Sequence, residues 1–82
     1  MVRIKVKLFA GARQRAGCDE VSLELPEPAT IGAVREALRL RWPELKPLVD
    51  RAFFAVNFQY SADATVLTDG HEVAWIPPVS GG

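Results

Sequence analysis

Apolar and polar residues alternate strictly at the start of the chain, which is typical of a strand with one buried face. In residues 2–9 the apolar positions are Val2, Ile4, Val6 and Leu8, and the positions between them are Arg3, Lys5, Lys7 and Phe9. Residues 21–25 alternate in the same way until Pro26 and Pro28 end the pattern. We expect these two strands to form a hairpin, joined by a short segment between Gly11 and Gly17.

A helical pattern follows the second strand. Thr30 is a suitable N-cap, because its hydroxyl can accept a hydrogen bond from a free N–H of the first turn, and Pro43 ends the helix. The positions at helical spacing are Ile31, Val34, Leu38 and then Arg41 or Trp42. We expect this helix to cover one face of the sheet, followed by an irregular or briefly helical stretch through Pro47.

The second half of the chain returns to strands. Residues 53–58 read as a buried strand, residues 59–68 leave room for a short edge strand, and Asp69-Gly70 marks a turn into an alternating strand at 72–76. The element order predicts an α+β fold, with a mixed sheet of four to five strands and one main helix packed across it. A β-grasp domain at residues 1–76 with an extended tail at 77–82 fits best.

The tail is the most informative segment for function. It reads Pro77-Pro78-Val79-Ser80-Gly81-Gly82. The two prolines favour an extended backbone where the chain leaves the domain. The two glycines have no side chains, so the end of the chain is slim enough to enter a narrow channel. Six extended residues reach at most about 20 Å, enough to carry the Gly82 carboxylate into a partner's pocket. A carboxylate becomes an acyl donor only after activation, for example as an acyl-adenylate; the alternative is a flexible tail without function.

Size and charge exclude several other functions. A chain of 82 residues has room for one small core and no large pocket, so a self-contained enzyme is not expected. Ten basic residues balance ten acidic ones, which gives no electrostatic footprint for nucleic acid or an anionic membrane and points to protein partners. The single Cys18 and the distant His71 make neither a disulfide nor a metal site. We expect an intracellular protein without a targeting or membrane segment.

The residues 67–82 resemble the C-terminal signature of one family, the small subunit of molybdopterin synthase, a ubiquitin-like sulfur carrier. The resemblance extends more weakly to Leu8-Phe9-Ala10, Arg13, Gly17 and Val56-Asn57. Two positions depart from the pattern, because His71 stands where an acidic residue is usual and Trp75 where Phe is common. Neither departure touches the chemistry of the tail.

The resemblance implies a cycle of activation and sulfur transfer. An E1-like adenylating enzyme would adenylate Gly82 using Mg-ATP, and a sulfur donor protein would convert the adenylate to a thiocarboxylate. The tail would then enter the large subunit of molybdopterin synthase and pass sulfur to a cyclic pterin phosphate precursor, twice for each dithiolene of the molybdenum cofactor. The family implies a cytoplasmic assembly of two small and two large subunits. No metal or permanently bound cofactor is expected on this chain.

Alternation also predicts a docking face. It places Phe9, Ala74 and Ile76 on the sheet face away from the helix, while Val73 and Trp75 point to the core. The resemblance adds Tyr60, and it adds Arg13 as a candidate for an ion pair between subunits. Scattered apolar exposure is the alternative for each residue. The chain also carries other arginines that we expect to be solvated: Arg15, Arg35, Arg39 and Arg51.

Other functional interpretations remain open. The alternatives are a sulfur carrier for thiamine, tRNA thiolation or cysteine synthesis, a ubiquitin-like protein modifier, and a plain interaction domain. A persulfide role for Cys18 is disfavoured, since no His or Lys lies nearby in the sequence to activate its thiol. A catalytic role for His71 is also disfavoured, because it reads as an exposed turn residue beside Asp69-Gly70 with no pocket in view. Asp69 and Gly70 read as turn formers, and Asn57 as a residue that caps backbone groups.

Overall fold

The computed structural model describes residues 1–77. The elements in chain order are β1 (Val2–Leu8), α1 (Ala10–Ala16), β2 (Glu20–Leu25), β3 (Ala29–Thr30), α2 (Ile31–Arg41), the 3-10 turn η1 (Pro43–Leu45), α3 (Lys46–Arg51), β4 (Phe53–Val56), β5 (Gln59–Ser61), β6 (Val66–Leu67) and β7 (Glu72–Ile76). Five strands form one sheet in the order β2-β1-β7-β4-β5, and β3 pairs with β6 in a small second sheet. The predicted α+β architecture is confirmed.

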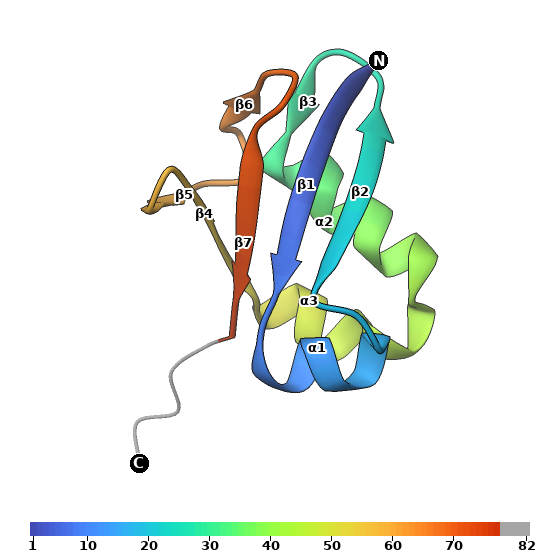
Figure 1. Ribbon diagram of the computed structural model, residues 1–82. Coiled ribbons are helices and arrows are strands. Elements are labelled where there is room, and N and C mark those ends of the chain that lie inside the picture. Colours follow the sequence, from blue (N-terminus) through green and yellow to red (C-terminus); the bar gives the residue numbers. More distant parts are fainter. Residues whose placement is uncertain (78–82) are drawn as a thin grey trace.

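The sheet is mixed because its two central strands run in the same direction. β1 pairs parallel with β7, while β2 and β4 flank this pair in antiparallel register. Helix α2 lies across one face of the sheet, and α1 and α3 lie at the edge where β1 ends (Figure 1). β1 and β7 therefore end at the same edge of the sheet, although they come from opposite ends of the sequence.

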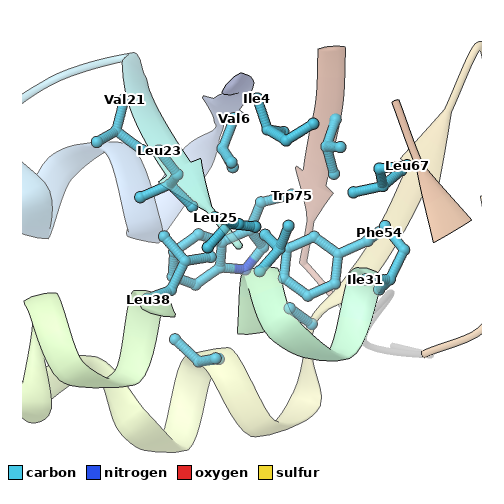
Figure 2. Close-up of a cluster of buried hydrophobic side chains, with 14 of the residues drawn as sticks. Ile4, Val6, Val21, Leu23, Leu25, Ile31, Leu38, Phe54, Leu67 and Trp75 are labelled. Atoms are coloured by element: carbon cyan, nitrogen blue, oxygen red, sulfur yellow. The ribbon is translucent and has the colours of Figure 1, made fainter. Parts of the chain in front are cut away.

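The core forms between α2 and the sheet face turned toward it. The β1 positions Ile4, Val6 and Leu8 are at most 1% exposed, as the alternation predicted. Figure 2 shows Trp75 and Phe54 beside the α2 side chains Ile31 and Leu38. Burial of each such apolar side chain stabilises the fold by about 1.5–3 kcal/mol, so this cluster holds the helix on the sheet.

The start of α2 confirms the predicted cap. The Thr30 hydroxyl accepts a hydrogen bond from the Ala33 N–H at 3.1 Å, and the helix ends one residue before Trp42, just ahead of Pro43. β1 and β2 are antiparallel neighbours, as expected for the hairpin. The segment that joins them is not a simple turn, however, because residues 10–16 form α1, which ends at Gly17 with a φ of 77°.

Two further sequence predictions need correction. The strand expected at residues 53–58 ends at Val56, since Asn57 and Phe58 both have positive φ and form the two-residue turn into β5. That strand is also not buried on both faces, because Phe53 is 53% exposed. The expected edge strand is present as β5, and the β3–β6 pair was not expected.

Arg35 is not the solvated arginine that the sequence suggested. Its side chain is only 14% exposed and donates hydrogen bonds to the backbone carbonyls of Val49, at 2.6 Å, and Ala52, at 3.1 Å. It also pairs with Asp63 at 3.0 Å and lies 4.9 Å from the centre of the Phe54 ring. Arg35 therefore connects α2 to the end of α3 and to the loop before β6.

We expect Arg35→Met to lower the free energy of unfolding by about 2–3 kcal/mol, since it leaves two carbonyl acceptors without their charged donor. Urea unfolding followed by circular dichroism measures the change. The matched control is Arg39→Met, whose ion pairs with Asp50 and Glu36 lie at the surface, and it should cost much less. Equal losses in the two variants would contradict the structural role assigned to Arg35.

Candidate functional site

The tail leaves the domain at the end of the central strand β7. The strand ends at Ile76, and Pro77 is exposed and outside any strand. Proline has no N–H to donate to a neighbouring strand, so it cannot continue the ladder. This exit lies at the edge where β1 ends and α1 begins (Figure 1). The predicted roles of Pro78, Val79, Ser80, Gly81 and Gly82 fall outside the described residues and stay predictions.

No helix within residues 1–77 covers the sheet face opposite α2 (Figure 1). Strand register places one row of side chains across it, because Ala74 of β7 is paired with Lys7 on one side and Ala55 on the other, and Ala55 is paired with Tyr60. Ile76 is paired with Phe53 in the next row. The prediction that Ala74 and Ile76 occupy this face is confirmed by the burial of their neighbours, since Val73 is 0% and Trp75 1% exposed. We call this surface the open face.

The open face contains a depression beside β5. Its lining residues are Ala55, Asn57, Phe58, Tyr60, Glu72, Ala74 and Ile76. The lining combines the small side chains of Ala55 and Ala74 with the aromatic rings of Phe58 and Tyr60. Tyr60 also packs against Phe53, with 5.8 Å between ring centres. Within residues 1–77 no group of histidine, cysteine or carboxylate side chains could hold a metal ion. The depression is therefore mainly an apolar surface bordered by aromatic rings.

Phe9 and Arg13 belong to a neighbouring group. They line a second depression with Lys7, Leu8, Asp19 and Glu20, at the junction of β1 and α1. Phe9 is 45% exposed, and Arg13 makes no ion pair within residues 1–77. The five predicted interface residues therefore form two groups, Phe9 with Arg13 and Tyr60 with Ala74 and Ile76, which meet at the paired positions Lys7 and Ala74.

Sequence reasoning missed two aromatic residues of the open face. Phe53 and Phe58 were assigned to a buried strand, yet Phe53 is half-exposed and Phe58 fully exposed. Alternation within β4 carries the signal for Phe53, since Phe54 and Val56 take the core positions. The signal for Phe58 was hidden, because Asn57-Phe58 lacks the glycine that usually marks a two-residue turn.

The remaining candidates have structural roles. The Asp69 carboxylate accepts a hydrogen bond from the Arg3 N–H at 2.7 Å, and Gly70 has a φ of 88°, which confirms the turn that precedes β7. His71 Nδ1 accepts a hydrogen bond from the Thr68 N–H at 3.1 Å, so the ring closes the same turn. Cys18 is partly buried against the core. None of these residues lines the depression beside β5.

A model of the ThiS family matches residues 6–82. The chain belongs to the ThiS family. Its relatives include the molybdopterin synthase sulfur carrier subunit of Arabidopsis thaliana, which is 36% identical over 81 residues and aligns with 99% of this chain and 84% of its own length. The resemblance to molybdopterin synthase small subunits noted from residues 67–82 is therefore confirmed.

Two solved structures are similar to this ThiS-family chain in fold as well as in sequence. The putative molybdopterin converting factor, subunit 1 from Pyrococcus furiosus matches with a TM-score of 0.87 and 38% identity, covering 96% of this chain and 100% of its own. SAMP1 from Haloferax volcanii matches with a TM-score of 0.84 and 30% identity, covering 98% of this chain and 99% of its own. The predicted ubiquitin-like β-grasp fold is confirmed.

None of the helices in the described part of this ThiS-family chain is long and apolar enough to cross a membrane.

Proposed function

We propose that this chain is the sulfur-donating small subunit of a molybdopterin synthase and that Gly82 carries the sulfur. The observation that supports this most strongly is the sequence Pro77-Pro78-Val79-Ser80-Gly81-Gly82, which follows Ile76, the last residue of the central strand β7 and a residue of the open face. The relatives in the family are named as sulfur carriers of this synthase. Alone the chain is a tethered co-substrate and not an enzyme.

Activation is the first step of the proposed cycle. The Gly82 carboxylate attacks the α-phosphate of Mg-ATP on an E1-like adenylating enzyme, pyrophosphate leaves, and an acyl-adenylate forms. The terminal sulfur of a donor persulfide then attacks the acyl carbon and displaces AMP. A thiol cleaves the resulting acyl disulfide, which releases the thiocarboxylate and leaves the donor oxidised as a disulfide. The chain contributes only its carboxylate, and Mg-ATP is bound by the partner.

Transfer is the second step. In the large subunit's active site the thiocarboxylate sulfur replaces a carbon-bound oxygen of a cyclic pterin phosphate precursor, so a C–S bond forms as a C–O bond breaks, and the displaced oxygen leaves as water or stays on the phosphate. Water then cleaves the thioester, which returns the Gly82 carboxylate and leaves the sulfur on the pterin. Two such transfers supply both sulfurs of the dithiolene. An enclosed site protects the activated end from water until the substrate is in place. We place this cycle in the cytoplasm, in an assembly of two small and two large subunits.

The open face suits the docking that this cycle requires. Phe9, Tyr60, Ala74 and Ile76 present apolar surface beside the tail exit, where a partner that binds them would receive the tail at the same time. Arg13, free of internal ion pairs among residues 1–77, is the proposed charged contact at the rim of the interface.

A second candidate function is a ubiquitin-like protein modifier. The similarity to SAMP1, a small archaeal modifier protein, favours it. In that case the activated Gly82 carbonyl would form an isopeptide bond with a lysine amine instead of receiving sulfur. Sulfur carriers of thiamine, tRNA thiolation or cysteine synthesis share the activation chemistry and differ in the partner that accepts the sulfur. Lysine adducts on cell proteins would favour the modifier, and product formation with a large subunit favours the synthase.

Removal of Gly81 and Gly82 should abolish sulfur transfer while leaving the domain folded, because residues 1–77 contain the whole core described above. The assay is formation of the dithiolene product by large subunit supplied with the thiocarboxylated chain. The truncated chain should keep the circular dichroism spectrum and unfolding midpoint of the intact chain. A truncated chain that still supports product formation would refute the proposed role of the tail.

Phe9→Ala and Ile76→Ala should each weaken binding to the large subunit by about 1–3 kcal/mol if these side chains are central anchors. Isothermal titration with purified large subunit measures the loss. Leu40→Ala is the matched control, since Leu40 is an apolar side chain 74% exposed on α2, away from the open face. Unchanged affinity in both the Phe9 and the Ile76 variant would show that the partner docks elsewhere.

A further inference from the structure

We propose that Phe58 is an anchor residue for the large subunit, inserted into an apolar pocket of that partner from the turn between β4 and β5. This inference rests on the proposed function and deepens it. It extends the docking surface from the open face onto the tip of the hairpin and names a residue outside the sequence-predicted interface.

The backbone at Phe58 is in an unfavourable conformation for its side chain. Val56 and Gln59 are paired, so Asn57 and Phe58 form a two-residue loop, with φ values of 51° and 65°. Such a loop needs positive φ at both positions, which Asn tolerates and which glycine usually supplies at the second. A bulky aromatic residue is a rare and strained occupant of this region. Glycine or asparagine at position 58 would suit the isolated domain better.

Nothing within the described residues compensates for this strain. The Phe58 side chain is fully exposed, and the aromatic pairs found in residues 1–77 are Phe53 with Tyr60 and Phe54 with Trp75. The ring therefore contributes no packing to the core. A strained backbone that carries an exposed aromatic ring is explained by a contact made outside the chain.

The position of Phe58 indicates the partner that it fits. Phe58 lines the same depression as Tyr60, Ala74 and Ile76, so its contact surface is continuous with the proposed docking face. A phenyl ring has no polar atom, which calls for an apolar pocket in the partner, and aromatic residues are enriched among interface anchors.

Phe58→Asn separates this role from a structural one, because it removes the ring and relieves the strained backbone together. We expect the isolated variant to unfold at a temperature higher by about 4 °C or more, while its affinity for purified large subunit falls by about tenfold or more. Phe58→Tyr keeps the ring and should bind within a few-fold of the intact chain. Leu40→Asn removes an exposed apolar side chain from α2 and should leave the affinity unchanged.

Thermal unfolding and isothermal titration together decide the matter. Unchanged affinity of Phe58→Asn, with the intact chain binding normally, would overturn the anchor role and leave the proposed function standing. A lower unfolding temperature for Phe58→Asn would overturn the argument from strain. If the intact chain itself does not bind the large subunit, the proposed function fails, and the anchor role assigned to Phe58 fails with it.

Discussion

The parallel pairing of β1 with β7 is the constraint on which the rest of the structure depends. It places the first and last strands side by side at the centre of the sheet and makes both end at one edge. Because side chains alternate along a strand, β7 gives Val73 and Trp75 to the core and Ala74 and Ile76 to the open face. One short strand thus contributes to the core, supplies part of the open face and precedes the tail in the sequence.

This arrangement separates stability from chemistry. The domain holds its shape through the cluster between α2 and the sheet, while the proposed reactive group is a backbone carboxylate six residues beyond the last strand residue, Ile76. In the proposed cycle the chain needs no pocket of its own, since its partners would bind the ATP and the pterin. The chain would supply a docking surface and the tail that follows it. The role proposed for Phe58 fits the same division, because its strained turn would serve the partner at some cost in stability to the free domain.

Much of the fold followed from short-range patterns in the sequence. Strict alternation located β1, β2 and β7, and Thr30 with the spacing of Ile31, Val34 and Leu38 located α2. Helix α1 was missed because residues 10–16 contain only alanine, glycine and polar side chains, so no apolar periodicity marks it. The β3–β6 pair is too short to show a pattern. The exposure of Phe53 was readable from alternation within β4, whereas that of Phe58 was hidden by a turn without its usual glycine. The burial of Arg35 depends on tertiary contacts, which local composition does not reveal.

The central claim is that the Gly82 carboxylate accepts sulfur, and the intact mass of the chain tests it most directly. The chain is incubated with Mg-ATP, a cognate adenylating enzyme and a sulfur donor, and its mass is then measured. The account predicts replacement of one terminal oxygen by sulfur in the intact chain and no change in a chain that lacks Gly82. An unchanged mass in the presence of a demonstrably active adenylating enzyme would contradict it.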